Sequence, residues 1–381
     1  MEFKQITSFI KEIYGGKEFI PLSVPVFRGN EKKYLLECVD STFVSSVGKF
    51  VDKFEDMVAA YTGAKKAVVC VSGTNALHMA MILAGVERND EVITQALTFI
   101  ATCNAISYIG AHPVFIDVDR DTMGLSPTYM RQWLERNAEI RGAYCYNKYT
   151  GRRIRCCVPM HTFGHPVHLD ELVEVCQSWN IELVEDAAES IGSFYKDKHT
   201  GTFGKVGAIS FNGNKTITTG GGGMLLFNDE ELARLAKHLT TQAKMSHRWE
   251  FRHDNIGYNY RMPNINAALG CAQIEHLEEY VLNKRETSAK YAEFFNGING
   301  IEFFTEPFNC RSNYWLNAVI LQDKNQQQEF LEFTNSNGIM TRPIWELMYR
   351  LPMFKSCQHD SLENTIWFAD RVVNIPSSVR L

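Results

Sequence analysis

One lysine of the sequence lies in a glycine-rich loop near the end of an apolar run. Lys215 follows the apolar run 208–211 and precedes four consecutive glycines, Gly220 to Gly223. A lysine amine held in such a loop can clamp a phosphate or form a covalent bond with a carbonyl carbon. The surroundings lack the GxxxxGK[ST] spacing of a P-loop. They also lack the GxGxxG pattern that follows the first strand of a nicotinamide-binding protein.

An acidic residue ends another apolar run. Asp186 follows residues 181–184 and would lie at the carboxyl end of a buried strand. A carboxylate in that position is costly unless a cation or a hydrogen-bond donor faces it, so we expect Asp186 to meet a ligand group. The alternative is that Asp186 only caps a short helix.

The first apolar run, residues 67–71, is followed by a candidate phosphate site. Gly73 permits a close backbone approach, the Thr74 hydroxyl can donate a hydrogen bond, and Thr74 and Asn75 would open a helix. The free N–H groups at the start of a helix favour a phosphate. The alternative is an ordinary N-cap made by Ser72 or Thr74.

Two further features are weaker signals. Phe99 follows the second apolar run, residues 91–94. Its ring can stack on a flat ligand, although an aromatic side chain there more often packs in a core. His161, His165 and His168 lie within eight positions, as metal ligands sometimes do. They fall in a Gly-Pro turn with no helical spacing and no nearby Cys or Glu, so we expect no metal site.

The elements that must position these residues are short strands separated by helices. We expect a helix in residues 1–20 that ends near Gly15, further helices at 30–40, 49–61, 75–83 and 266–295, and strands at 67–71, 91–94, 113–116, 156–160, 181–184 and 208–211. This alternation predicts an α/β fold with a mostly parallel sheet buried on both faces. Ligands bind such sheets at the carboxyl ends of the strands, where the candidate residues fall. The alternation of short strands and helices stops near residue 270, and a strand-like run at 315–321 suggests a smaller C-terminal domain.

Composition excludes several classes of protein. The 381 residues carry 39 Lys and Arg against 44 Asp and Glu, a net charge of −5, and lack the basic footprint of a nucleic-acid or membrane-surface protein. Charged residues interrupt the N-terminal segment, and no apolar run approaches the roughly 18 residues of a membrane span. The ten cysteines show no paired metal spacing. We therefore expect a cytoplasmic protein with free thiols and no membrane insertion.

The candidate residues together suit one cofactor. A phosphate cradle, a ring stacker, an acid at a strand end and a loop lysine are the parts that a protein needs to hold pyridoxal 5′-phosphate. The lysine would bond the cofactor aldehyde, and Asp186 would keep the pyridine nitrogen protonated.

Four motifs in order resemble the DegT/StrS-type nucleotide-sugar aminotransferases. They are Ser72–Leu77, Glu185–Glu189, Ser210–Lys215 and Gly257–Met262, and the resemblance runs from about Pro25 to beyond Arg342. It implies the aspartate-aminotransferase (type I) fold, with a mixed, mostly parallel seven-stranded sheet between helices and a smaller α+β domain. We accordingly expect an N-terminal helix and arm at 1–30, a large cofactor-binding domain at 31–265 and a small domain at 266–381.

The same resemblance implies the site residues. Lys215 would be the Schiff-base lysine and proton shuttle, and Asp186 would pair with the pyridine nitrogen. Asn259 would reach the phosphate of the neighbouring subunit, which makes the protein a homodimer or higher homo-oligomer with shared sites. The other cofactor-binding residues are Gly73, Thr74, Asn75 and Ser210 at the phosphate, Phe99 and Ala188 against the ring, and Glu189 near its hydroxyl.

A finer resemblance concerns the substrate. The opening Phe19–Pro25 and the Asn-Gly-Asn-Lys loop look like the aminotransferases of legionaminic acid pathways. They imply transfer of an amino group from L-glutamate to C4 of a UDP-linked 4-keto-6-deoxy-N-acetylhexosamine, with pyridoxamine 5′-phosphate as the intermediate form of the cofactor. The alternatives are a GDP-4-keto-6-deoxymannose transaminase that makes perosamine, a cofactor-binding regulatory protein without turnover and, less favoured, a nicotinamide-dependent sugar oxidoreductase.

Overall fold

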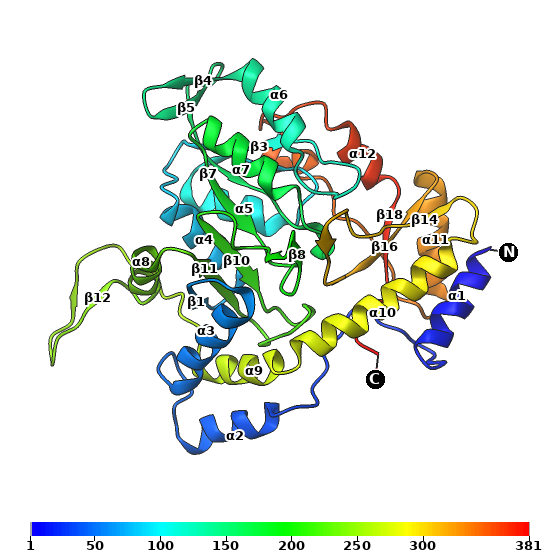
Figure 1. Cartoon of the computed structure of the whole chain (residues 1–381), viewed down its shortest axis with the longest axis horizontal. Helices are drawn as coiled ribbons and strands as arrows, with labels where there is room; N and C mark the ends of the chain where they lie inside the picture. The colour runs from blue at the N-terminus through cyan, green and yellow to red at the C-terminus, as the bar shows by residue number, and fades with distance from the viewer. Residues whose placement is uncertain (1, 381) are drawn as a thin grey trace.

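One mixed sheet forms the centre of the computed structural model, which describes residues 2–380 (Figure 1). Its main path runs in the order β1 (Lys66–Cys70), β11 (Gly223–Phe227), β10 (Val206–Ser210), β7 (Glu182–Asp186), β6 (Arg153–Val158), β2 (Glu91–Gln95) and β3 (His112–Ile116). Neighbours from β10 to β3 are parallel, whereas β11 is antiparallel to both β1 and β10. A hairpin of β4 (Ala138–Arg141) and β5 (Tyr144–Asn147) extends the sheet beside β6. The expected mixed, mostly parallel sheet is confirmed, but within residues 2–380 it has nine strands rather than seven, because the β4–β5 hairpin adds two.

One strand of that path, β11, was not located by the strand pattern of the sequence. It begins at Gly223, the last residue of the glycine run that the sequence suggested as a loop. Gly223 must lack a side chain, because an added Cβ would collide with the backbone of Ser72. The glycines therefore let β11 enter the sheet between two other strands, directly beside the start of a helix.

Helices cover both faces of the sheet (Figure 1). One face packs against three helices, α4 (Gly73–Leu83), α5 (Ile100–Ile109) and α8 (Glu230–Thr240). The other packs against α3 (Lys49–Thr62), α6 (Pro127–Asn137), α7 (Leu169–Ser178), α9 (Asn264–Ile274) and the start of α10 (Leu277–Phe295). Burial on both sides explains why the strands are continuous apolar runs rather than alternating ones. The ten cysteines are all free thiols, and most of them are buried in these two layers.

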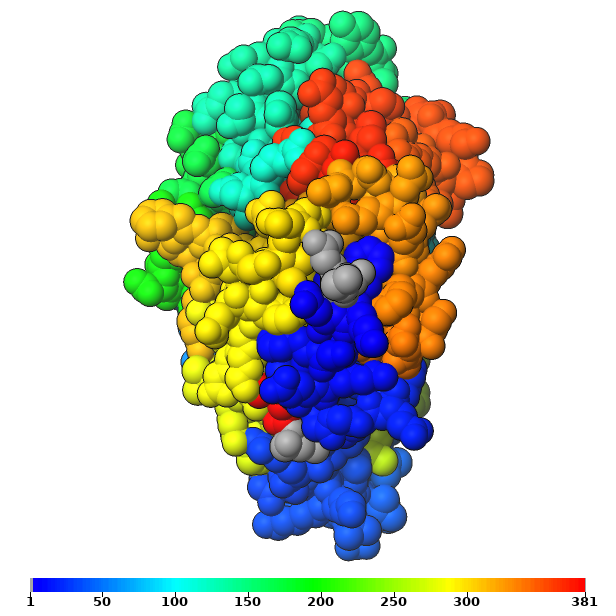
Figure 2. Space-filling view, turned by 90° about the vertical axis from the view of Figure 1, so that its right-hand side faces the viewer, coloured from blue at the N-terminus to red at the C-terminus, as the bar shows by residue number. Residues whose placement is uncertain are grey.

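The C-terminal part forms a second, antiparallel sheet. Its strand order is β14 (Ile301–Phe303), β16 (Asn317–Leu321), β18 (Val372–Ile375) and β17 (Arg342–Pro343), with helices α11 (Lys324–Ser336) and α12 (Glu363–Ala369) packed against it. Helix α1 (Glu2–Ile13) joins the same hydrophobic core, where the Phe9 ring stacks on Phe294 with centroids 4.0 Å apart. Figure 2 shows α1 lying against α10 and the C-terminal elements. The first helix of the chain thus completes the core of the last domain.

The remaining elements are short. They are α2 (Glu31–Asp40), the three-stranded sheet of β15 (Cys310–Arg311), β8 (Phe194–Tyr195) and β9 (Lys198–His199), the hairpin of β12 (Lys244–Met245) and β13 (Arg252–His253), and 3-10 turns at Thr162–Gly164, Met348–Arg350 and Pro352–Phe354. The β12–β13 hairpin projects away from the body of the chain beyond α8 (Figure 1). Among residues 2–380, no helix has an apolar stretch long enough to cross a lipid bilayer.

The domain limits at residues 30 and 265 stay predictions. Helix α9, which begins at Asn264, shares a hydrophobic core with α3 and not with the antiparallel sheet. The long helical stretch expected at 266–295 is divided into α9 and α10, so the passage from one core to the other takes place along α10.

The packing of α3 on α9 can be tested at Phe54. This ring is fully buried, lies 5.0 Å from the Phe211 ring and fills the space left by Gly270. We expect Phe54→Ala to lower the free energy of unfolding by about 3–5 kcal/mol, because the truncated side chain leaves a cavity. Urea unfolding followed by fluorescence measures the change.

The matched control is Phe308→Ala, since the Phe308 side chain is 87% exposed. Its free energy of unfolding should stay within about 0.5 kcal/mol of that of the unaltered protein. Equal losses in the two variants would contradict the assigned packing.

Candidate active site

The expected residues surround one cavity of about 340 Å³ at the carboxyl ends of β1, β7 and β10. In a mostly parallel sheet these strand ends meet at one edge, so loops far apart in the sequence face each other there. The cavity is lined by Ser72, Gly73, Thr74, Leu77, Phe99, Ala101, Met160, Asp186, Ala188, Glu189, Ser210, Asn212, Asn214, Lys215, Gly221, Gly222, Trp315 and Trp345.

The Lys215 amine reaches into this cavity from the loop after β10. Its Nζ atom donates to Glu189 Oε1 at 3.4 Å and lies 3.7 Å from the centre of the Trp315 ring. Trp315 is itself held to the loop, because its Nε1–H donates to the Asn214 carbonyl oxygen at 2.7 Å. A carboxylate and an aromatic face therefore contact the amine.

Asp186 is the last residue of β7 and is almost completely buried. Its carboxylate accepts hydrogen bonds from Thr102 Oγ1 at 2.7 Å and from the Ala188 N–H at 3.2 Å. Burial raises the pKa of the Asp186 carboxyl, and the hydrogen bond from Thr102 opposes that rise. This carboxylate would stabilise a cationic ligand group strongly, because little water is present to screen the attraction between the two charges.

Glu189 is a second buried carboxyl at the cavity wall. It accepts the Phe163 N–H at 2.9 Å as well as the Lys215 amine. Burial raises its pKa to about 7, although the Lys215 charge works in the opposite direction. At neutral pH Glu189 can therefore either hold or accept a proton next to the lysine amine.

The N-terminus of α4 forms the phosphate end of the cavity. Ser72 is the N-cap, and its Oγ accepts the Asn75 N–H at 3.2 Å. The N–H groups of Gly73 and Thr74 belong to the first helical turn, whose donors have no partner within a helix. A Cβ on Gly73 would lie 2.8 Å from Ser210 Cβ, so only glycine lets this helix start close to the Ser210 hydroxyl. The N–H groups at the start of α4 and the hydroxyls of Thr74 and Ser210 together suit a phosphate dianion.

The structure brings the expected residues together with two exceptions. Asn75 serves the helix cap, because its N–H and its side-chain Oδ1 both bond Ser72, and it does not line the cavity. Asn259 is exposed beside Thr241, away from the cavity of its own chain. The three histidines do not converge: His161 bonds Glu185, His168 bonds Asp121, and His165 lies between aromatic rings.

Several lining residues have no signal in the sequence. Trp315 precedes a strand of the C-terminal sheet, a hundred positions after Lys215, and only the packing of the two domains places it on the lysine. Thr102, which bonds Asp186 without lining the cavity, was likewise not singled out in the sequence. Trp345 also lines the cavity, and its ring lies 6.3 Å from the Phe99 ring.

Comparison with known proteins shows the family. The model of the DegT/DnrJ/EryC1/StrS aminotransferase family matches residues 25–381, and the chain belongs to this family. GDP-perosamine synthase of Escherichia coli O157:H7 is 36% identical over 362 residues, which cover 94% of this chain and 93% of that protein. The putative pyridoxal phosphate-dependent aminotransferase EpsN of Bacillus subtilis is 36% identical over 346 residues, 91% of this chain and 86% of that protein.

Solved structures agree with this assignment. The aminotransferase TlmJ from Streptoalloteichus hindustanus has a TM-score of 0.85 at 26% identity, covering 94% of this chain and 93% of that one. The chain is therefore a pyridoxal-phosphate-dependent sugar aminotransferase with the type I fold. The residues on the cavity fit that cofactor, since they offer a phosphate cradle at Gly73, Thr74 and Ser210, a buried acid at Asp186 and an amine at Lys215.

Stability should depend on pH through Glu189. The folded chain holds the pKa of this carboxyl at about 7 by burial, above its ordinary value of 4.5, so the folded state binds the proton more tightly than the unfolded state. The stabilising contribution is therefore complete below about pH 4.5 and is lost as the pH rises to about 7. Each unit of this difference corresponds to about 1.4 kcal/mol.

Urea unfolding of the full chain without cofactor, repeated from pH 5 to pH 8, measures this contribution. The variant Glu189→Gln cannot titrate, so its free energy of unfolding should fall less over the same range. Parallel pH curves for the two proteins would contradict a raised pKa at Glu189.

Proposed function

We propose that this enzyme moves an amino group from L-glutamate to C4 of a nucleotide-linked 4-keto-6-deoxy sugar. The observation that carries the proposal is the Lys215 amine, held 3.4 Å from Glu189 in the cavity that Asp186 and the start of α4 also line. Both substrates would use this one cavity in turn, as expected of a ping-pong reaction. The product is an amino sugar for surface polysaccharide or nonulosonic acid synthesis.

Pyridoxal phosphate supplies an aldehyde that bonds amines and a ring that takes up electrons from the carbon being deprotonated. Lys215 is the base that removes the α-proton of glutamate and later returns a proton to C4 of the sugar. Asp186 would hold a proton on the pyridine nitrogen, and its bonds from Thr102 and Ala188 fix the direction of its carboxylate. Gly73, Thr74 and Ser210 would hold the phosphate, and Phe99 and Ala188 would lie against the ring.

UDP and GDP are the two candidates for the nucleotide that carries the sugar. The Phe19–Pro25 segment and the lysine loop resemble enzymes that use UDP-linked 4-keto-6-deoxy-N-acetylhexosamine, which favours UDP. The names of relatives such as the Escherichia coli GDP-perosamine synthase favour GDP-4-keto-6-deoxymannose instead. We take the GDP sugar as the first substrate to test, since that likeness extends over 94% of the chain.

The test is incubation of the purified enzyme with glutamate and UDP-, GDP- and dTDP-linked 4-keto-6-deoxy sugars, with mass detection of the amino product. We expect an amino sugar with one nucleotide carrier and 2-oxoglutarate in equal amount. Lys215→Ala should abolish turnover, and Asp186→Ala should slow it by about 100- to 10,000-fold, because proton transfer loses its support. Full turnover by Lys215→Ala, or no glutamate half-reaction in the unaltered enzyme, would contradict the proposal.

A second copy of the chain would complete the site. Asn259 lies away from the cavity of its own chain, and we propose that it contacts the cofactor phosphate of a partner subunit. Large apolar side chains are exposed near it and along the N-terminal segment, an arrangement typical of an interface. They include Trp249, Phe251 and Ile256 around the β12–β13 hairpin, and Phe19, Phe27, Leu36, Val39, Phe43 and Val47.

Mixing two inactive variants tests the shared site. Lys215→Ala and Asn259→Ala should each have little activity, whereas random exchange of their subunits should restore about a quarter of the normal rate. Half of the dimers are then mixed, and each mixed dimer carries one site with both native residues. Activity that never exceeds that of the separate variants would contradict a site shared between subunits.

A further inference from the structure

Glu185 and Asp186 are consecutive buried carboxyls at the end of β7. Successive residues of a strand point to opposite faces, so Asp186 faces the cofactor cavity while Glu185 faces away from it. Glu185 is fully buried and does not line the cavity. A buried charge of this kind is retained only where donors surround it.

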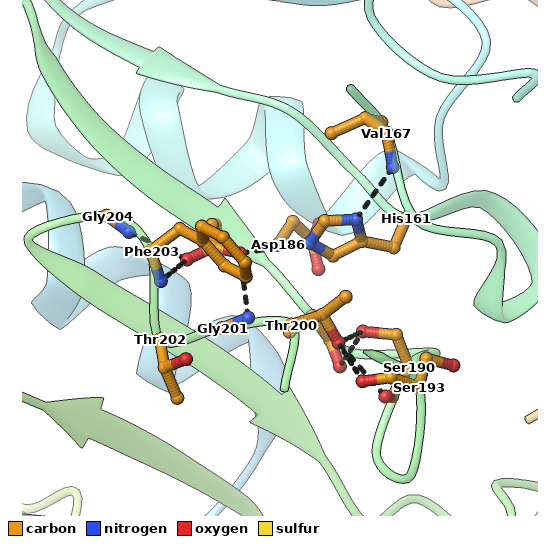
Figure 3. Close-up of polar contacts among 12 residues, drawn as sticks. His161, Val167, Asp186, Ser190, Ser193, Thr200, Gly201, Thr202, Phe203 and Gly204 are labelled. Carbon is orange, nitrogen blue, oxygen red and sulfur yellow. Dashed lines mark hydrogen bonds and ion pairs between the residues drawn. The ribbon is translucent and has the colours of Figure 1, made fainter. Parts of the chain in front are cut away.

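Four donors surround the Glu185 carboxylate. The backbone N–H groups of Gly201, Phe203 and Gly204 donate to it at 2.7, 2.7 and 2.8 Å. The His161 ring contacts it through Nε2 at 3.2 Å. Figure 3 shows the loop from Gly201 to Gly204 to the left of His161, and both contact the Glu185 carboxylate.

The loop is built to approach this carboxylate. Gly201 has a φ of +85°, a backbone conformation that residues with a side chain rarely adopt. A Cβ on Gly204 would lie 2.5 Å from the Leu183 carbonyl oxygen. Burial alone would raise the pKa of Glu185, but the bonds from His161, Gly204 and Gly201 outweigh it and hold the pKa below its usual value. Glu185 therefore stays ionised although it is out of water.

His161 also holds the backbone of Asp186. The backbone N–H of His161 donates to the Asp186 carbonyl oxygen at 3.2 Å, and the backbone N–H of Asp186 donates to the Pro159 carbonyl oxygen at 2.9 Å. His161 Nδ1 accepts the Val167 N–H at 3.3 Å, so we assign the ring proton to Nε2, where it points at Glu185 (Figure 3). Gly201 also lies close to Ala187, the residue after Asp186, since a Cβ on Gly201 would lie 3.2 Å from Ala187 Cβ.

We propose that Glu185 is a positioning residue for Asp186: its ionised carboxylate draws the 201–204 loop and His161 together and so fixes the carboxylate of Asp186 against the pyridine nitrogen of the cofactor. The inference rests on the role of Asp186 in the proposed function. Glu185 acts from the opposite face of β7, through the backbone, and touches neither cofactor nor substrate.

The variant Glu185→Gln tests the proposal with little change in shape. Its amide NH2 must face one of the four donors, which leaves that donor unpaired and loosens the loop. In the holoenzyme we expect kcat of the glutamate half-reaction to fall by as much as about 100-fold, the cost of a small misplacement of a catalytic group. KM for glutamate should change little. The pH midpoint of the absorbance change of the bound cofactor should rise, because less positive charge stays on its ring.

The matched control is Glu182→Gln in the same strand. Glu182 pairs with Lys205 at 3.0 Å and Arg155 at 3.4 Å at the far end of β7, so its loss should leave kcat and the absorbance midpoint unchanged. If Glu185→Gln fails to fold, Glu185→Asp serves instead, since it keeps the charge but withdraws the carboxylate from its donors. It should then show a smaller change in the same direction.

Three results would decide the matter. A Glu185 variant that is less stable but keeps kcat and the absorbance midpoint would overturn the proposal, because the residue would then be only structural. Changes in both quantities for Glu185→Gln and neither for Glu182→Gln would support it. If Asp186→Ala itself left the half-reaction unchanged, the proposed role of Asp186 would fail first, and that failure is distinguishable from a failure of Glu185 alone.

Discussion

Three carboxyl groups and an amine lie out of water at one edge of the central sheet, and each must find a partner there. Asp186 has Thr102 and the Ala188 N–H, Glu189 has Lys215 and the Phe163 N–H, and Glu185 has three backbone donors and His161. An unpartnered charge at this depth would cost several kcal/mol, so the surrounding loops have little freedom. The precision of the site follows from this requirement.

The partners come from distant parts of the chain because parallel strands end at a common edge. The loop after β10 brings Lys215, the turn after β7 brings Glu189, and the segment before β16 brings Trp315 over the lysine. Trp315 also bonds the Asn214 carbonyl, so this segment helps to set the conformation of the lysine loop. The cavity is thus lined both by loops of the central sheet and by the C-terminal part of the chain.

Sequence reasoning located the reactive groups better than it located their supports. Lys215, Asp186 and Gly73-Thr74 stood out because polar residues that follow buried strands are unusual and therefore informative. Thr102 and Trp315 could not be found this way, because a threonine in a helix and a tryptophan before a strand are ordinary in themselves. Asn75 was expected at the phosphate, but its N–H is taken by the Ser72 cap, a competition that only the geometry of the helix start decides.

The amino-acid sequence by itself determined the alternation of strands and helices and the family of the chain, because hydrophobic periodicity and short motifs are local properties. The six expected strands of the central sheet lie close to their expected positions, with ends shifted by a few residues, whereas β11 was hidden by its glycines. Only the tertiary structure decided which donors meet Glu185, which ring covers Lys215 and which core receives α1. Those contacts join residues far apart along the chain, and their energies depend on burial, which no single segment specifies.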